Sequence, residues 1–463
     1  MRPVTTTKLR LKAFGASVGL SLLFLLVYFW CNRTAATLAY VPTLNFDWER
    51  FIPFVPVMIV PYMSIDLFFV AAPFLCRTDR ELATFSKRII AAILIAGLCF
   101  LLFPFRFAFD RPPADGWLGA IFTWFRGLDQ PFNLLPSLHI VFLVILTEHY
   151  WQHLRGVWRF GLNLWFILVG FSTLLTYQHH LLDVVTGFAV GVYCVYFIRE
   201  SRAEPRAMPN RRVGFCYAMC AIGLLAPIAW LWPWGALLLW PALACGIVAA
   251  AYFGFGVPLF WKIDGRLHWA ARIALAPCRM GQRISLIYYR GQCAAWNKIT
   301  PDVWIGRVLN QQEAESATSL GVSAVLDLTM EFSAPAPFRV LVYRNIPVLD
   351  LTAPSVEQLR EMAEFIAEES GRGIVYVHCK IGYSRAAAAV AAYLLQTQRV
   401  KSVPEAIDLL RRARPAIVVR PEVISALHTF ARGLVIAELR KNGQSSSISG
   451  GPIFSSPGAM APP

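Results

Sequence analysis

A short polar loop near the C-terminal end combines a cysteine, a glycine, a serine and an arginine at a spacing suited to phosphate chemistry. The loop reads His378-Cys379-Lys380-Ile381-Gly382-Tyr383-Ser384-Arg385 and joins a short buried strand, predicted over 374–378, to an alanine-rich helix. Backbone amides at a helix N-terminus can wrap a phosphoryl group, and the helix dipole favours negative charge there. The same field favours the thiolate form of Cys379, which is the form that attacks phosphorus.

The other loop positions have matching roles. Arg385 can bind two phosphoryl oxygens and stabilise the transition state. Gly382 lets the backbone turn closely around the ligand, and Ser384 can hydrogen-bond the cysteine sulfur as a phosphoenzyme breaks down. The remaining phosphate contacts are predicted from the backbone amides of the loop, at Lys380, Ile381, Gly382 and Tyr383.

This loop resembles the signature of the dual-specificity phosphatases, within the protein tyrosine phosphatase superfamily. The resemblance covers about residues 300–440 and includes Trp304-Ile305-Gly306, Gly321 to Leu328 and the neighbourhood of Arg412 to Pro415. It implies an α/β fold and a general acid after the second strand, where Asp350 stands. A loop aspartate such as Asp350 commonly caps a helix instead, and Asp327 competes for the role of acid.

A second group of ionisable residues lies at the ends of apolar segments. Pro136-Ser137-Leu138-His139 opens one segment, and Gln178 to Asp183, which includes His179 and His180, opens another. Such residues are functional candidates where they face a bundle interior. A nucleophilic imidazole, a carboxylate that orients it, a second imidazole as acid, and cations for the phosphate would support phosphoryl transfer.

These residues resemble the motifs of the type 2 phosphatidic acid phosphatase superfamily, over about residues 50–200. The resemblance makes His179 the nucleophile, Asp183 its orienting carboxylate and His139 the general acid. It assigns phosphate contacts to Ser137 and Arg111, with Arg106 as a further candidate cation. The family's lysine and second arginine are replaced by Pro104 and Thr173, and branches that transfer lipid head groups lack these cations.

The elements that must position both groups are predicted from hydropathy. The chain has 463 residues, of which 57% are hydrophobic and 15% charged, so membrane spans are expected. A spanning helix needs about 20 apolar residues. Eight segments qualify, and they form an expected α-helical multi-pass bundle at 13–31, 51–75, 89–105, 136–152, 158–177, 180–198, 213–232 and 234–260.

The charge of the loops predicts how the eight spans are oriented in the membrane, because cytoplasmic loops are rich in lysine and arginine. The basic loops are those around Arg77 to Arg88, Arg155 to Arg159 and Arg199 to Arg212. They alternate along the chain with loops that contain fewer lysine and arginine residues. The prediction is therefore a multi-pass inner or plasma membrane protein with a cytoplasmic N-terminus. Residues from 262 onward are also predicted in the cytoplasm, and His179 at the opposite face.

The domain organisation follows from these segments. We expect a bundle over 1–212, two further spans over 213–261, a basic interfacial or solvated linker over 262–300, the phosphatase domain over 301–440 and a disordered tail over 441–463. Within the phosphatase domain, strands are predicted over 322–328, 340–348 and 374–378. Ser355 and Gln358 form a capping-box signature for a following helix.

The composition of the chain excludes several classes of function. The net charge of +15 lies in short clusters that orient a membrane protein rather than bind nucleic acid, and ten scattered cysteines show neither a disulfide framework nor metal spacing. We therefore expect neither cofactor nor metal. The leading hypothesis is a phosphatase of phospholipids such as phosphatidylglycerophosphate, on which both resembled families have members that act. Two alternatives are a lipid head-group phosphotransferase coupled to a phosphatase, and a membrane-anchored protein phosphatase with a degenerate bundle.

Overall fold

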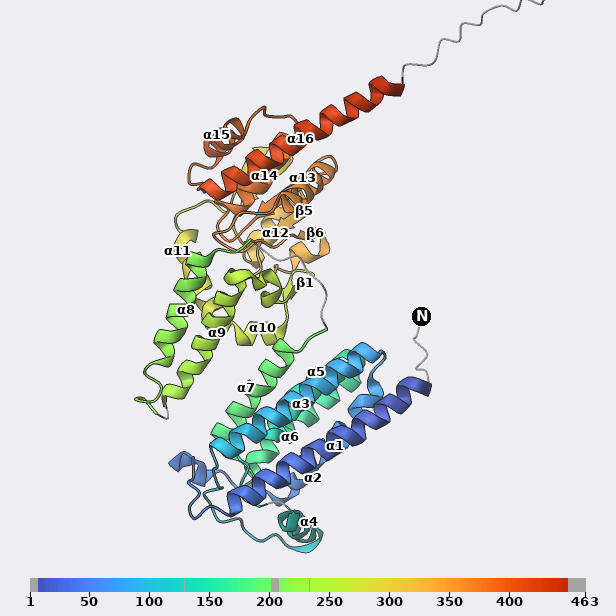
Figure 1. Cartoon of the computed structure of the whole chain (residues 1–463), viewed down its shortest axis with the longest axis vertical. Helices are drawn as coiled ribbons and strands as arrows, with labels where there is room; N and C mark the ends of the chain where they lie inside the picture. Colours follow the sequence, from blue (N-terminus) through green and yellow to red (C-terminus); the bar gives the residue numbers. More distant parts are fainter. Residues whose placement is uncertain (1–6, 129, 201–207, 233, 449–463) are drawn as a thin grey trace, which may run out of the picture. The chain divides into compact units, whose positions relative to one another are not determined.

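The structure is a computed structural model that describes residues 7–128, 130–200, 208–232 and 234–448. The chain divides into two compact units, Met1–Ala203 and Glu204–Pro463. The first is all-helical, and the second joins a helical segment to an α/β domain (Figure 1). The two units are described separately below.

The N-terminal unit is a helical bundle. Its elements are α1 (Thr7–Ala36), η1 (Asp47–Phe51), η2 (Pro56–Met58), α2 (Ile59–Ala71), η3 (Ala72–Leu75), α3 (Asp79–Leu102), α4 (Gly116–Leu128), α5 (Leu138–His153), α6 (Gly156–Leu175) and α7 (Leu181–Phe197). Helix α3 packs between α1 and α5, α5 packs on α7, and α2 packs on α6. Close packing of α5 on α7 depends on Gly187, where a Cβ atom would lie 2.6 Å from the Ser137 carbonyl oxygen.

Five helices of the described residues are long and apolar enough to cross a membrane, which is fewer than the eight predicted. They are Thr7–Ala36, Pro56–Leu75, Asp79–Leu102, Gly156–Leu175 and Trp234–Phe255, with Leu181–Phe197 as a shorter apolar helix. The expected spans at 136–152 and 213–232 correspond to α5, with 16 residues, and α8, with 15. Both are shorter than the roughly 20 residues that a perpendicular crossing needs. Helix α4 was not predicted.

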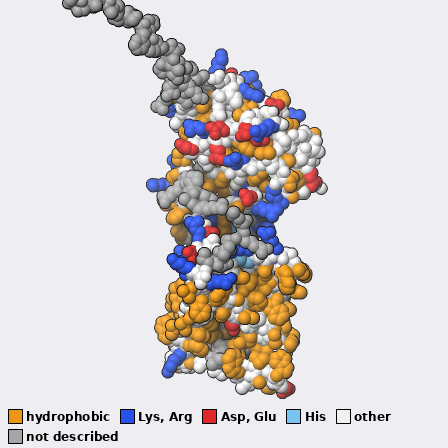
Figure 2. All heavy atoms as spheres, turned by 90° about the vertical axis from the view of Figure 1, so that its right-hand side faces the viewer, with side chains coloured by type: hydrophobic (Ala, Val, Ile, Leu, Met, Phe, Trp, Pro, Cys, Tyr) orange, Lys and Arg blue, Asp and Glu red, His pale blue; other side chains and the backbone are white. Residues whose placement is uncertain are grey.

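The surface of the N-terminal unit agrees with a membrane environment. On the face in Figure 2, hydrophobic side chains cover most of this unit, whereas lysine, arginine and carboxylate side chains gather on the C-terminal unit. Large apolar side chains of α1 and α3 are exposed, including Leu11, Leu26 and Leu98. A monomeric soluble protein rarely exposes apolar patches of this extent.

The C-terminal unit begins with a helical segment. Its elements are α8 (Arg211–Leu225), η4 (Trp234–Leu238), α9 (Leu239–Ala250), the π-helical turn η5 (Ala251–Phe255), η6 (Val257–Phe260), the short hairpin of β1 (Lys262–Ile263) and β2 (Arg266–Leu267), α10 (Trp269–Ala274) and α11 (Ala276–Arg290). Helices α8 and α9 pack on each other, and α9 also packs on α11. We call residues 208–292 the helical collar.

The α/β domain that follows is built on one five-stranded sheet. The strands are β3 (Trp296–Thr300), β4 (Val303–Gly306), β5 (Val322–Asp327), β6 (Val342–Asn345) and β7 (Ile374–His378), in the order β3-β4-β7-β5-β6. All neighbours are parallel except β3 and β4. The helices are α12 (Gln311–Ser319), η7 (Pro337–Val340), α13 (Val356–Ser370), α14 (Arg385–Gln396), α15 (Val403–Ala413) and α16 (Pro421–Ile448).

Alternation along the strands separates two cores, because successive side chains point to opposite faces of a sheet. In β7, Val375 and Val377 face the core formed with α13, α14, α15 and α16, while Tyr376 faces the core with α12 and η7. Helix α14 is buried over nearly all of its length, which explains its run of alanines. The sheet thereby holds the carboxyl end of β7 at the start of α14.

Most predicted elements of this domain are present. The strands expected at 322–328 and 374–378 are β5 and β7, and Ser355 and Gln358 form the predicted capping box of α13. The strand expected at 340–348 is shorter, because Val340 belongs to η7.

Two of the expected segments, the linker and the tail, differ from the expectation. Strand β3 lies inside the segment expected to be a linker, and that segment also contains α10 and α11. Helix α16 continues past Lys441 to Ile448 instead of ending before the tail, and 449–463 lie outside the described residues.

Candidate active site

The predicted phosphate loop lies between β7 and α14, and its conformation depends on Gly382. This residue has φ +79°, and a Cβ atom there would lie 2.4 Å from the Gly306 carbonyl oxygen on the neighbouring strand. Only glycine fits both constraints. The Gly382 N–H donates to Cys379 Sγ at 3.2 Å, and Cys379 is 4% exposed. The sulfur is thus enclosed by the loop that was predicted to bind phosphate.

Arg385 begins α14 and is held by a carboxylate that the sequence did not indicate. Its guanidinium donates to Glu331 Oε1 at 2.8 Å, to Glu331 Oε2 at 3.3 Å and to the Val348 carbonyl oxygen at 2.9 Å. Burial alone would lower the pKa of Arg385, but the charges of Glu331 and Asp350 raise it well above its ordinary value. Arg385 therefore stays charged, with its planar head fixed.

Asp350 and Asp327 have clearly different environments. The Asp350 carboxylate is 29% exposed, and its Oδ1 lies 3.3 Å from Arg385 Nη2. Asp327 is 1% exposed and accepts hydrogen bonds from Lys262 Nζ at 2.6 Å, the Tyr343 hydroxyl at 2.5 Å and the Thr329 amide at 2.8 Å. Burial would raise the pKa of Asp327, but Lys262 and His378 lower it overall, so it stays ionised. Asp327 is therefore a buried carboxylate paired with Lys262, whereas Asp350 is partly exposed beside Arg385.

The remaining loop residues contact elements outside the loop. Lys380 Nζ donates to Gln282 Oε1 of α11 at 2.6 Å. Arg414 Nη2 donates to the Ile381 carbonyl oxygen at 2.8 Å, and its guanidinium lies 5.6 Å from the Tyr383 ring centre. Ser384 is the N-cap residue of α14 and its side chain makes no capping bond. Arg414 lies within the neighbourhood that carried the family resemblance, whereas Gln282 gave no sequence signal.

The same region is similar to known phosphatases. Residues 303–432 match the family described as dual specificity phosphatase, catalytic domain. Dual specificity protein phosphatase 9 of Homo sapiens is 29% identical over 168 residues, which are 34% of this chain and 43% of that protein. Phosphatidylglycerophosphatase and protein-tyrosine phosphatase 1 of Mus musculus is 35% identical over 100 residues, 21% of this chain and 51% of that protein.

Solved structures with similarity include PTPMT1 in complex with PI(5)P, at 22% identity and a TM-score of 0.29 over 31% of this chain and 99% of that one. Tk-PTP in its active form is 27% identical with a TM-score of 0.28, over 30% of this chain and 97% of that one. The C-terminal region carries a dual specificity phosphatase catalytic domain. The chain spans 43% and 51% of the two curated relatives named above.

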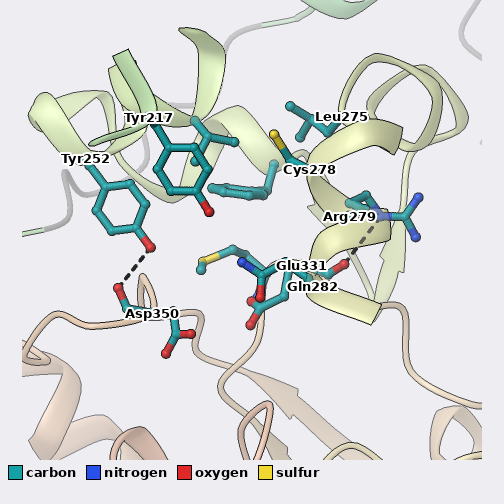
Figure 3. Close-up of a pocket in the computed structure, with 11 residues that line it drawn as sticks. Tyr217, Tyr252, Leu275, Cys278, Arg279, Gln282, Glu331 and Asp350 are labelled. Atoms are coloured by element: carbon teal, nitrogen blue, oxygen red, sulfur yellow. Dashed lines mark hydrogen bonds between the residues drawn. The ribbon is translucent and has the colours of Figure 1, made fainter. Parts of the chain in front are cut away.

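A pocket is lined by Glu331 and Asp350, two carboxylates that contact Arg385. Figure 3 shows Asp350 and Glu331 on the phosphatase side, with Tyr217, Tyr252, Leu275 and Cys278 of the helical collar opposite them. The Tyr252 hydroxyl donates to the Asp350 carbonyl oxygen at 2.9 Å. The collar therefore shares this pocket with the two carboxylates that contact Arg385.

In the N-terminal unit, the structure brings together only some of the predicted residues. His179 Nδ1 lies 3.5 Å from Asp183 Oδ2, and the Ser137 N–H donates to the Asp183 carbonyl oxygen at 3.0 Å. The Ser137 hydroxyl caps α5. His139 stacks on Tyr62 at 3.9 Å between ring centres, and its Nε2 lies 3.1 Å from the Tyr62 carbonyl oxygen.

The two cations of this group are placed differently from each other. Arg111 lies over the Phe107 ring at 5.4 Å, and Phe107 stacks on His180 at 4.3 Å. The Arg106 side chain is exposed. His180 is 1% exposed and its Nδ1 lies 3.0 Å from Glu49 Oε2. His180 is therefore a buried residue with a structural role, paired with a carboxylate and adjacent to His179.

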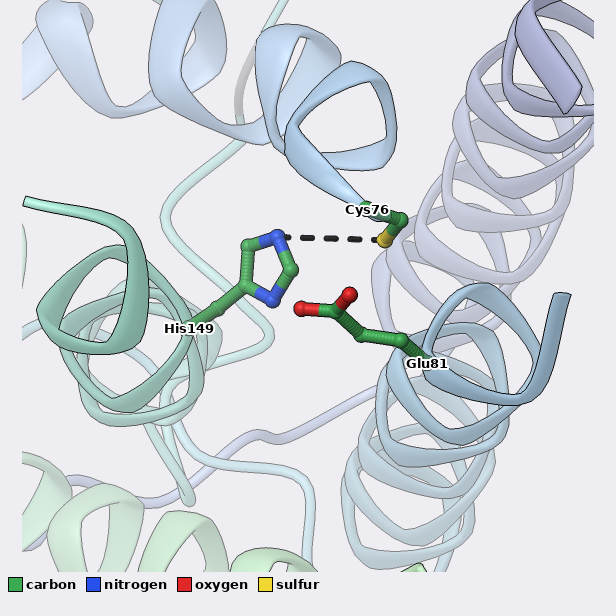
Figure 4. A group of neighbouring side chains, drawn as sticks. All are labelled: Cys76, Glu81 and His149. Atoms are coloured by element: carbon green, nitrogen blue, oxygen red, sulfur yellow. Dashed lines mark hydrogen bonds between the residues drawn. The ribbon is translucent and has the colours of Figure 1, made fainter. Parts of the chain in front are cut away.

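A third group contains residue types that bind metals, although the sequence spacing predicted no metal site. Cys76, Glu81 and His149 have ligand atoms within 4.8 Å of one another (Figure 4). His149 Nε2 lies 2.9 Å from the Ala72 carbonyl oxygen, and Glu81 Oε1 lies 2.9 Å from His153 Nε2. The distance in sequence between residues 76 and 149 explains why no spacing rule detects the group. Each side chain already has a protein partner.

Proposed function

We propose that this protein is a membrane-anchored phosphatase that hydrolyses phosphate monoesters through Cys379. The observation that carries the proposal is the arrangement of one nucleophile and one fixed cation in a single loop. Cys379 Sγ accepts the Gly382 N–H at 3.2 Å, and Arg385 in the same loop is oriented by Glu331 at 2.8 Å. A phosphoryl group bound there would meet a thiolate, loop amides and a guanidinium together.

In the first step, the Cys379 thiolate attacks phosphorus and the bond to the ester oxygen breaks. The leaving alkoxide takes a proton from Asp350, which is partly exposed and lines the pocket. The product alcohol departs, and a cysteinyl phosphate remains in the loop. Arg385 and the loop amides stabilise the charge on the phosphoryl oxygens in the transition state.

In the second step, water attacks the cysteinyl phosphate. The Asp350 carboxylate accepts the proton from that water, the sulfur–phosphorus bond breaks, and inorganic phosphate and the thiolate are released. Ser384 at the N-terminus of α14 is the candidate to donate a hydrogen bond to the departing sulfur. The cycle consumes one water molecule and needs neither cofactor nor metal.

The proposed substrate is a phospholipid with a terminal phosphate monoester, such as phosphatidylglycerophosphate. Two observations support this. Five helices are long and apolar enough to cross a membrane, and a relative with 35% identity over 100 residues is named phosphatidylglycerophosphatase and protein-tyrosine phosphatase 1. An enzyme held at a bilayer meets lipid substrates at high local concentration.

The test is phosphate release by the purified full-length protein in detergent micelles. Phosphatidylglycerophosphate, phosphatidic acid, phosphoinositides and a phosphotyrosine peptide are compared for the parent and for Cys379→Ser. We expect release from a lipid that Cys379→Ser abolishes. Release from the peptide alone would favour the protein phosphatase alternative, and undiminished release by Cys379→Ser would contradict the thiolate mechanism.

We further propose a second phosphoesterase site at His179, of the type 2 phosphatidic acid phosphatase kind. The observation in its favour is that His179 Nδ1 lies 3.5 Å from Asp183 Oδ2, a separation from which the carboxylate could orient the imidazole in the proposed reaction. His139 would protonate the leaving oxygen. In the Cys379→Ser protein, residual release or head-group transfer that His179→Ala removes would support this site. Labelled head groups distinguish transfer to lipid from transfer to water.

For topology, we propose a cytoplasmic N-terminus and phosphatase domain, with the His179 group at the opposite face. The alternating arginine-rich loops of the sequence support this orientation. A reporter inserted after Asp183 should be accessible from outside the cell, and one fused at Lys441 should not. The opposite labelling pattern would show that the chain is oriented the other way round in the membrane.

A further inference from the structure

The pocket beside Arg385 has walls of two kinds. Its phosphatase side consists of Met330, Glu331 and Asp350, and both carboxylates lie within 3.3 Å of the Arg385 guanidinium. The opposite side comes from the helical collar, which lies outside the residues that match the phosphatase family. A molecule in this pocket would contact residues that hold Arg385 on one side and the helical collar on the other.

The part of the collar side that comes from α8, α9, η5 and η6 is aromatic and apolar, whereas α11 adds Arg279 and Gln282. Tyr217 of α8 and Tyr252 of η5 are stacked, with ring centres 6.0 Å apart and planes 9° apart. Val248, Phe260 and Leu275 continue the same wall. Figure 3 shows the two tyrosine rings side by side, facing the two loops that carry Asp350 and Glu331. Such a surface favours an apolar group over a charged peptide chain.

Hydrogen bonds fix this wall to the catalytic loops. The Tyr252 hydroxyl donates to the Asp350 carbonyl oxygen at 2.9 Å, and Asn210 Nδ2 donates to the next carbonyl oxygen, that of Leu351, at 2.8 Å. Gln282 of α11 accepts from Lys380 Nζ at 2.6 Å. The wall is thus attached both to the loop of the proposed acid and to the phosphate loop.

The outer surface of the same helices indicates where the apolar group comes from. Exposed hydrophobic side chains continue along α8 and α9, among them Phe215, Met219, Ile222, Trp240 and Leu243. The segment between the helices exposes Trp230, Trp232 and Trp234, a residue type that is enriched at membrane interfaces. The pocket wall is therefore the inner side of a helix pair whose outer side suits lipid.

We propose that Tyr217, Tyr252 and Val248 form a binding site for the apolar part of a bilayer phospholipid whose terminal phosphate reaches Arg385. This inference rests on the proposed lipid phosphatase function and assigns its selectivity to the helical collar. Binding energy from the lipid chain would then be used to position the phosphate, which makes acyl chain length a determinant of kcat/KM.

The experiment is a chain-length series with the full-length protein in micelles of constant composition. Phosphate release is measured from glycerol 3-phosphate, from phosphatidic acids with acyl chains of increasing length, and from p-nitrophenyl phosphate. The parent is expected to gain about 10-fold or more in kcat/KM along the series. Tyr217→Ser should lose most of that gain, while its rate on p-nitrophenyl phosphate falls by less than about 3-fold, and Tyr217→Phe should retain the gain.

The matched control is Phe215→Ser, an aromatic-to-serine change on the same helix at a side chain that is 61% exposed and outside the pocket. It should keep the chain-length dependence. The inference is overturned if the parent shows no dependence on chain length, or if Tyr217→Ser and Phe215→Ser behave alike. Failure of the proposed lipid function is seen separately, as a parent enzyme that releases phosphate from p-nitrophenyl phosphate but from no lipid.

Discussion

Glu331 Oε1 lies 2.8 Å from Arg385 Nη2, and both side chains are almost completely buried. The pair fixes the guanidinium before any phosphate is present, since a charged head on a long side chain otherwise samples many rotamers. Glu331 is therefore a positioning residue for the proposed reaction, and it touches the phosphoryl site only through Arg385.

Glu331→Gln is expected to lower kcat/KM for p-nitrophenyl phosphate by about 100-fold, because a misplaced guanidinium loses transition-state contacts. The inhibition constant for inorganic phosphate should rise in parallel, which a general loss of folded protein would not cause. Glu361→Gln is the control, since Glu361 forms an exposed pair with Arg344. Equal phosphate inhibition of the parent and Glu331→Gln would contradict the positioning role.

Asp350→Asn tests the proposed acid. We expect a loss of about 100- to 1000-fold with an alkyl phosphate, whose leaving group must be protonated. The loss should be much smaller with p-nitrophenyl phosphate, whose leaving group departs as a stable anion. Stopped assays on both substrates give the ratio, and an equal loss on the two would rule out proton donation by Asp350.

Gly382→Ala should abolish activity without unfolding the protein, because the added Cβ would lie 2.4 Å from the Gly306 carbonyl oxygen at a positive φ. We expect a loss of at least about 100-fold in kcat. Gly433→Ala is the matched change, because nothing lies within 4 Å of a Cβ there and the residue is inside α16. That variant should be fully active and more stable by about 0.5–1 kcal/mol.

The buried Asp327–Lys262 pair predicts a dependence of stability on pH. Because folding lowers the pKa of Asp327, its contribution is complete above the unfolded value of about 4 and is lost as pH falls below it. The free energy of unfolding should therefore decrease on acidification below about pH 4. Lys262→Met, which leaves the carboxylate buried without its cation, should cost about 3–5 kcal/mol at neutral pH.

Urea unfolding of the detergent-solubilised protein, followed by tryptophan fluorescence, measures both effects. Asp327→Asn should reduce the slope of stability against pH in the acid range. A slope unchanged by that substitution would show that other groups dominate acid unfolding.

The parts of the site that are local in sequence could be predicted, and the parts assembled by the fold could not. Cys379, Gly382 and Arg385 lie within seven consecutive positions, so their spacing alone indicates a phosphate loop. Glu331 and Gln282 reach the same loop from 54 and 98 residues away. No periodicity or motif links such positions in a single sequence.

The competition between Asp350 and Asp327 also needed the structure. The two differ in their partners: Asp327 pairs with Lys262, which lies in the segment expected to be a linker and instead contributes a buried cation to the phosphatase domain. The ends of the predicted membrane spans also could not be determined from the sequence. Hydropathy finds apolar segments, but helix ends depend on local turns, and α5 and α8 are shorter than their apolar segments suggest.

The Lys262–Asp327 contact also bears on how this chain could have been assembled in evolution. A catalytic domain can be exchanged between proteins only if few buried contacts cross its boundary. Here a boundary at residue 301 would leave Asp327 without its ammonium partner and β4 without strand β3. A segment that keeps both contacts must begin ahead of Lys262, so it includes at least α10 and α11 of the helical collar.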